Sequence, residues 1–166
     1  MDAAQRMGRN GFPRLMVFNI LSKRSNVPGL RSGFVAGDAQ ILEKFLLYRT
    51  YHGSAMSPVV QAASTAAWND EAHVIENRRL YTQKFSDAMR ILSDVINIQM
   101  PDAGFYFWLE TPISDTEFTK RLYQDYNVIV LPGSYLARDA HGVNPGTNYV
   151  RIALVTTPSE CAEAMQ

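Results

Sequence analysis

The chain has 166 residues, which is enough to bury a hydrophobic core as one domain or as two small ones. Its 16 basic and 16 acidic side chains cancel, which argues against a nucleic-acid binder and against electrostatic attachment to a membrane. No apolar run approaches the roughly 18 residues of a membrane-spanning helix. The single Cys161 indicates a reducing compartment, so we expect a cytoplasmic protein.

The first part of the chain is predicted to contain two short strands and two helices. The strands are expected at 14–21 and 33–37, and the helices at 39–48, with Asp38 as N-cap, and at 58–68, with Ser57 as N-cap. Because both faces of the first run are apolar, we expect that strand to be buried.

At residue 69 the composition changes, and we place a domain boundary there. A long amphipathic helix is predicted for 70–95, with one apolar face made by Val74, Leu80, Phe85, Ala88, Met89 and Leu92. The pattern then alternates, with strands at 96–100, 104–109, 128–131 and 149–155 and helices at 115–126 and from 158 onward. This alternation predicts an α/β fold.

Three cationic side chains stand in distinctive surroundings. Lys23 and Arg31 belong to the stretch Ser-Lys-Arg-Ser-Asn-Val-Pro-Gly-Leu-Arg-Ser-Gly-Phe at 22–34, which follows the first predicted strand. Arg151 lies in the strand Asn-Tyr-Val-Arg-Ile-Ala-Leu at 148–154. A planar guanidinium suits a phosphate or a carboxylate. From the residues alone, however, Lys23 is more often a solvated surface lysine, and Arg151 fits an internal ion pair or an outward-pointing side chain equally well.

Together these motifs resemble the class I/II (fold type I) aminotransferases that depend on pyridoxal 5′-phosphate. The stretch 22–34, with Tyr-His-Gly-Ser-Ala-Met-Ser-Pro at 51–58, looks most like the N-succinyldiaminopimelate aminotransferase branch. The resemblance covers essentially the whole chain and implies the C-terminal portion of such an enzyme. Residues 1–68 would be the end of the large cofactor-binding domain, and 69–166 the small C-terminal α/β domain.

The resemblance also implies roles for individual residues. Lys23 is expected to hold pyridoxal 5′-phosphate as a Schiff base and to carry the proton, Arg31 to bind the phosphate, and Arg151 to bind the substrate α-carboxylate. Ser22 is a further cofactor candidate, although in a strand its side chain would face away from that of Lys23. Family members usually carry a serine three residues before the lysine. Ile20 stands there in this chain, which predicts weaker phosphate binding or a position that has drifted in a non-functional copy.

Three more residues are candidates for substrate binding. His52 and Ser54 lie in a loop that, in the family, reaches toward the partner subunit, and Phe105 opens a strand whose first aromatic approaches the substrate. The alternatives are an exposed loop for His52 and Ser54 and core packing for Phe105. The sequence has no Cys/His metal spacing and no glycine-rich nucleotide motif, so no metal site is expected.

The implied enzyme transfers an amino group from an amino acid to a 2-oxo acid and works as a homodimer. Its substrates would be N-succinyl-LL-diaminopimelate and 2-oxoglutarate, in lysine biosynthesis. The alternatives are another class I aminotransferase, of the aspartate or aromatic/kynurenine type, and an incomplete, non-catalytic fragment with a structural or dimerising role. Neither the aspartate that would bind the pyridine nitrogen nor the aromatic that would stack on the ring can be assigned in this chain.

Overall fold

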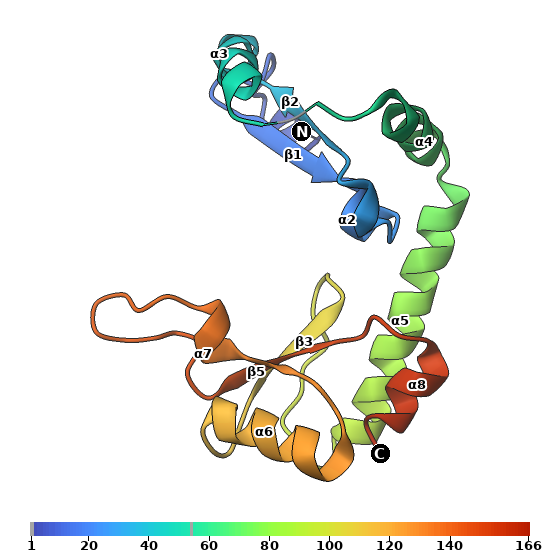
Figure 1. Cartoon of the computed structure of the whole chain (residues 1–166), viewed down its shortest axis with the longest axis vertical. Helices are drawn as coiled ribbons and strands as arrows, with labels where there is room; N and C mark the ends of the chain where they lie inside the picture. Colours follow the sequence, from blue (N-terminus) through green and yellow to red (C-terminus); the bar gives the residue numbers. More distant parts are fainter. Residues whose placement is uncertain (1, 54) are drawn as a thin grey trace. The chain divides into compact units, whose positions relative to one another are not determined.

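The computed structural model describes residues 2–53 and 55–166 and divides into two compact units (Figure 1). Unit 1 runs to Asn77 and unit 2 begins at Arg78, so the division lies inside the single helix α5 (Ala72–Leu92). The boundary expected at residue 69 coincides with the end of α4 (Pro58–Asn69). The protein is of the α/β type, and within the described residues no helix is both long and apolar enough to cross a membrane.

Unit 1 is built on two antiparallel strands. Its elements are α1 (Asp2–Arg6), β1 (Met16–Ile20), α2 (Leu21–Arg24), the 3-10 turn η1 (Pro28–Leu30), β2 (Gly33–Gly37), α3 (Ala39–Tyr51), α4 and the start of α5. In the β1–β2 pair Met16 lies opposite Gly37 and Ile20 lies opposite Gly33. The expected strand at 33–37 is therefore confirmed, whereas α1, α2 and η1 were not predicted, because elements of three to five residues leave no periodic signal.

Side-chain caps begin α3 and α4 where the sequence places them. The carboxylate of Asp38 accepts hydrogen bonds from the backbone N–H groups of Gln40 and Ile41. The hydroxyl of Ser57 accepts from the N–H of Val60, and Pro58 occupies the first helical position. These bonds satisfy amide donors that a helix start otherwise leaves unpaired.

The expectation that β1 is buried is wrong for this structure. Phe18 is 62% exposed and Ile20 is 52% exposed. A two-stranded ribbon has only its covering helices to shield it. Its aromatic contacts include Phe18 with Phe45 on α3 and Phe34 with Trp68 on α4. Apolar residues on both faces of a strand are thus no guarantee that both faces are covered.

Unit 2 packs helices against one face of an antiparallel sheet. Its elements after α5 are β3 (Tyr106–Glu110), α6 (Asp115–Tyr126), β4 (Leu131–Pro132), α7 (Gly133–Leu136), β5 (Tyr149–Ala153) and α8 (Pro158–Glu163). The strand order is β3-β5-β4. Its core consists of buried side chains from α5, β3, β5, α8 and the segments that connect them, namely Phe85, Ala88, Ile98, Phe107, Leu109, Val130, Val150, Leu154 and Cys161.

Two strand predictions in unit 2 need correction. Residues 96–100 form no strand, although Ile98 is buried in the core. The segment is apolar because it packs Ile98 into the core, but its backbone does not pair with another strand. The strand expected at 128–131 is reduced to Leu131 and Pro132, and α7 follows it at once. Helix α6 has the bounds that the sequence predicts.

A buried carboxylate ties the loops of unit 2 together. Asp115, at the start of α6 and 3% exposed, accepts hydrogen bonds from the N–H and hydroxyl of Ser134 at 2.9 and 2.6 Å and from the N–H of Asn148 at 3.3 Å. Nearby, a β-carbon added to Gly133 would lie 2.4 Å from the carbonyl oxygen of Gly146, so only glycine fits this crossing. The bonds and the close backbone approach fix the entry to β5, the strand that carries Arg151.

Candidate functional site

Lys23 lies in α2, the single helical turn that follows β1. The turn is anchored by Leu21, which is fully buried and whose N–H donates to the carbonyl of Ser32 at 3.1 Å. Ser22 is half-buried and Lys23 is exposed. Because the backbone is helical here, the strand-like opposition expected for Ser22 and Lys23 is wrong, since neighbours in a helix lie about 100° apart rather than on opposite faces.

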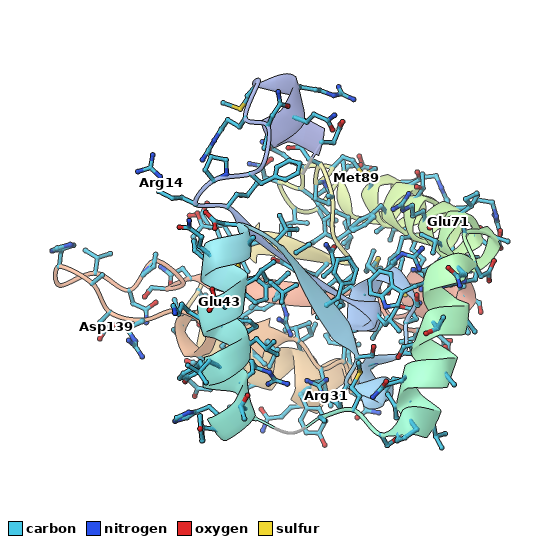
Figure 2. All side chains as sticks on the ribbon, turned by 90° about the horizontal axis from the view of Figure 1, so that it is seen from above. Arg14, Arg31, Glu43, Glu71, Met89 and Asp139 are labelled. Atoms are coloured by element: carbon cyan, nitrogen blue, oxygen red, sulfur yellow. The ribbon has the colours of Figure 1, made fainter. Side chains whose placement is uncertain are left out.

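Arg31 ends the η1 turn eight residues after Lys23, between α2 and β2 (Figure 2). Its backbone is left-handed, with φ of 51° and ψ of 34°, and its Nη1 donates to the carbonyl of Pro28 at 3.0 Å. The side chain is otherwise exposed. The η1 turn thus presents a guanidinium from the same connection that carries the lysine.

An open cavity of about 480 Å³ adjoins Arg31. Its lining residues include Arg31, Arg49, Ser57, Gly29 and Gly33. Two guanidinium groups and a hydroxyl make a donor set that suits an anion. Arg49, in the last turn of α3, was not predicted, because nothing in its sequence spacing relates it to Arg31.

The loop after α3 holds two of the sequence candidates. His52 is exposed, and its ring stacks on that of Tyr48 with centroids 4.5 Å apart and planes 2° from parallel. Ser54 lies outside the described residues, so its expected role stays a prediction. The stacking on Tyr48 gives the His52 ring a defined orientation, and its expected contact with a substrate stays a prediction.

Arg151 lies on the face of the unit 2 sheet that is turned away from the core. It pairs across the strands with Trp108, and its guanidinium carbon lies 5.6 Å from the ring centroid of Tyr106. Its Nε atom is buried and has no hydrogen-bond partner among the described residues. An orphaned, buried guanidinium N–H is costly unless an acceptor reaches it, and a carboxylate is the acceptor that matches it best.

The aromatic ring that faces the Arg151 guanidinium is that of Tyr106. The substrate contact expected of Phe105 stays a prediction. Phe105 is half-buried just before β3, its ring meets that of Tyr106 edge-on at 5.2 Å, and its carbonyl accepts from the N–H of Leu154. Trp108 stacks on Tyr149 at 5.7 Å on the same face as Tyr106. The alternation of side chains along a strand could have indicated this arrangement, because Tyr106 and Trp108 lie on the face opposite to that of the buried Phe107.

The donor chemistry of both units fits a phosphate-bearing aldehyde cofactor and a carboxylate substrate. Unit 1 carries a lysine in α2 and two arginines that line a cavity, and unit 2 offers the unsatisfied Nε of Arg151. Ile20 is half-exposed and brings no hydroxyl to the turn, so phosphate contacts would depend more heavily on Arg31. Bound there, pyridoxal 5′-phosphate would supply the electron-withdrawing ring for amino-group chemistry.

Comparison with known proteins identifies the family. Residues 1–166 match the family described as Aminotransferase class I and II. A probable aminotransferase of Mycobacterium tuberculosis, Rv1178, is 32% identical over 91% of this chain and 35% of its own length. Diaminopimelate, aromatic-amino-acid and aspartate aminotransferases occur among other relatives.

Two solved structures show the same fold. An aminotransferase from Neisseria meningitidis superposes with a TM-score of 0.90 at 57% identity, covering 98% of this chain and 42% of its own. A probable N-succinyldiaminopimelate aminotransferase from Thermus thermophilus gives 0.77 at 27% identity, covering 94% and 41%. The chain therefore spans about two fifths of the length of the proteins it matches. It belongs to the class I and II aminotransferases, a family of enzymes that depend on pyridoxal 5′-phosphate.

Proposed function

We propose that this chain carries the lysine and the arginines of an aminotransferase that moves an amino group from an amino acid to a 2-oxo acid. The observation that carries the proposal is the α2–η1 connection of unit 1, which carries Lys23 in α2 and, eight residues later, Arg31, a lining residue of an open cavity that Arg49 also lines. A family match over the whole chain supports the same chemistry.

Each residue has a separate task in this proposal. Lys23 binds the cofactor aldehyde through its amine and then moves the proton at the substrate α-carbon. Arg31 binds the phosphate by charge-assisted hydrogen bonds. Ser22, which lies in the same helical turn as Lys23, is a further contact of the cofactor. Arg151 binds the substrate carboxylate, and the aromatic face of β3 shields it from water. His52, Ser54 and Phe105 remain proposed substrate contacts, the first two toward a partner subunit in a homodimer.

The finer proposal is that the amino donor is N-succinyl-LL-diaminopimelate and the acceptor 2-oxoglutarate, as in lysine biosynthesis. The resemblance of the stretches 22–34 and 51–58 supports it, and so does the name of the Thermus thermophilus structure. The test is a comparison of kcat/KM for N-succinyl-LL-diaminopimelate, LL-diaminopimelate, aspartate and phenylalanine. A preference for any of the last three would replace the succinylated substrate while leaving the aminotransferase proposal intact.

Reductive trapping tests the role of Lys23. The chain is incubated with pyridoxal 5′-phosphate, reduced with borohydride and mapped by peptide mass spectrometry. We expect the label on Lys23 in preference to Lys44 and Lys120, which are equally exposed, and Lys23→Ala should abolish it while Lys44→Ala should not. A label that spreads evenly over the exposed lysines, or favours another one, contradicts the assignment.

The phosphate role of Arg31 has a matched ligand control. Losing a charge-assisted hydrogen bond costs about 1.5–3 kcal/mol, so Arg31→Ala should weaken binding of pyridoxal 5′-phosphate roughly 10- to 100-fold. Binding of pyridoxal, which lacks the phosphate, should stay unchanged. An equal loss for both compounds would show that Arg31 supports the turn rather than the phosphate.

A further inference from the structure

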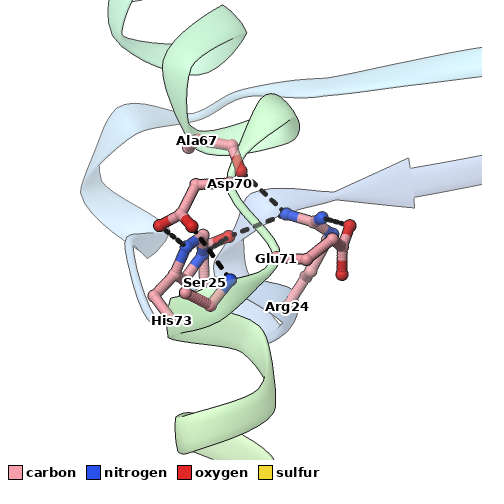
Figure 3. A network of polar contacts seen from close by, with 7 residues as sticks. Arg24, Ser25, Ala67, Asp70, Glu71 and His73 are labelled. Atoms are coloured by element: carbon pink, nitrogen blue, oxygen red, sulfur yellow. Dashed lines mark hydrogen bonds and ion pairs between the residues drawn. The ribbon is translucent and has the colours of Figure 1, made fainter.

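The three side chains that follow Lys23 in the sequence all form hydrogen bonds with the end of α4 or the beginning of α5. Figure 3 shows most of this network. We call it the clasp and define it by Arg24, Ser25, Asn26, Ala67, Asp70, Glu71, His73 and Asn77. All of these residues belong to unit 1. The bonds join positions 43 to 51 residues apart in the sequence.

Arg24 is the most constrained member of the clasp. Its side chain is 18% exposed, its Nη2 forms an ion pair with Glu71, and its Nη1 donates to the carbonyl of Ala67 at 2.9 Å. The guanidinium carbon also lies 4.8 Å from the ring centroid of Trp68. Contacts at the ring face and at both terminal nitrogens hold a planar guanidinium in one orientation. The residue next to Lys23 is thereby held to α4 and α5.

Ser25 is held through His73 and Asp70. The hydroxyl of Ser25 lies 2.8 Å from His73 Nε2, and His73 Nδ1 lies 2.7 Å from Asp70 Oδ2. The hydrogen bond to His73, and then the bond from the N–H of Ala72, holds the pKa of Asp70 below its ordinary value. Asp70 therefore stays a carboxylate that orients the histidine.

The order Ser–His–Asp also occurs in nucleophilic triads, but the surroundings here favour a supporting role. The backbone N–H of Ser25 is engaged by the carbonyl of Leu21, so it is not available to stabilise an oxyanion. Asn26, in left-handed conformation, adds a third bond, from its Nδ2 to Asn77 Oδ1 at 2.6 Å. Neighbouring residues of one turn thus share the same anchor.

We infer that the clasp fixes the turn that carries Lys23, and that Arg24 and Glu71 are positioning residues for its amine. The inference rests on the proposed role of Lys23. Helix α2 has four residues, too few to be stable by itself. Productive geometry at a reacting amine depends on a fixed backbone, and the clasp adds a second constraint to the anchor that Leu21 gives the turn.

The test substitutes the clasp without touching Lys23. In Glu71→Gln and Arg24→Lys, amide hydrogen exchange at 22–26 in the cofactor-free chain should accelerate about tenfold, as expected for local opening of a segment that has lost its anchor. The preference of borohydride-trapped pyridoxal phosphate for Lys23 over Lys44 should fall by a similar factor. Arg24→Glu and Glu71→Arg should each speed the exchange and lower the preference for Lys23. The double variant that carries both substitutions restores an ion pair of opposite polarity, so it should recover part of the slow exchange and part of the preference.

Glu117→Gln is the matched control, because it removes the Arg121–Glu117 ion pair of 2.8 Å on α6 and should change neither readout. Unchanged exchange at 22–26 in both clasp variants overturns the inference. So does faster exchange with an unchanged preference for Lys23. If the unsubstituted chain is labelled at another lysine, the proposed function fails and the positioning role fails with it, and the exchange data then report only on a structural clasp.

Discussion

Unit 2 buries hydrophobic side chains from two helices, a sheet and their connections in one cluster, from Phe85 on α5 to Cys161 on α8. In unit 1, among the described residues, the buried hydrophobic side chains are Leu21 and Val74, while Phe18, Ile20 and Phe34 are about half exposed or more. Unit 1 instead concentrates its long-range polar bonds around α2. Burial of apolar area stabilises a unit globally, whereas a polar clasp orders one turn.

This difference separates the surroundings of two candidate residues, one in each unit. Arg151 sits on a sheet that is fastened to a closed core, so its backbone position follows from packing. Lys23 sits on a turn whose order follows from a few hydrogen bonds. We therefore expect substitutions to act in different ways in the two units, and the predictions below test that contrast.

The largest effect is expected in the core of unit 2. Phe107 is 1% exposed and meets Phe85 edge-on at 4.9 Å, so Phe107→Ala should lower the free energy of unfolding of unit 2 by about 3–5 kcal/mol. Phe18→Ala in unit 1 should cost about 1 kcal/mol or less, because its ring is mostly exposed. Urea titrations of single-tryptophan variants that retain Trp68 or Trp108 report on each unit separately. Equal losses would remove the contrast.

The second effect concerns the buried carboxylate of unit 2. Asp115→Asn should destabilise unit 2 by about 2–4 kcal/mol at pH 7, because bonds to a charged acceptor are lost. Burial raises the pKa of the Asp115 carboxyl, but the hydrogen bonds from Ser134 and from the N–H of Asn148 outweigh it and hold the pKa below its ordinary value.

The sign of the pH dependence follows from that lowered pKa. The stabilisation is present above the unfolded-state pKa of about 3.9 and is lost as the pH falls through the folded-state value. Unfolding curves at pH 7 and at pH 3 should therefore differ less in Asp115→Asn than in the unsubstituted chain. Asp70→Asn in unit 1, at a half-exposed carboxylate, should change the pH dependence less. The reverse ranking would contradict the comparison.

The smallest effect is expected at matched helix caps. Thr157 caps α8 in a capping box with Glu160, and Ser57 caps α4. Removing such a hydroxyl costs about 1 kcal/mol. Thr157→Ala should shift the unfolding midpoint of unit 2, since α8 buries Cys161 in the core. Ser57→Ala should instead speed amide exchange at the start of α4 and leave the unit 2 midpoint where it was.

Local signals predicted much of the secondary structure. The caps Asp38 and Ser57, the strand at 33–37 and the helix at 115–126 depend on neighbours within a few residues, so they can be identified from the sequence. The irregular path at 96–100 could not be, because an apolar segment packs against a core without pairing as a strand. The short α2 turn was missed for lack of any periodic pattern.

The sequence by itself determined the family and the residue types proposed for the site, since Lys23, Arg31 and Arg151 stand in motifs that can be recognised without coordinates. Only the tertiary structure brought Arg49 into the cavity beside Arg31, placed Tyr106 against Arg151, and linked Arg24 to Glu71. The physical reason is the distance along the sequence over which each kind of interaction acts. Caps and motifs act along the chain over a few residues, whereas cavities, ring contacts and the clasp join side chains that the chain itself holds far apart.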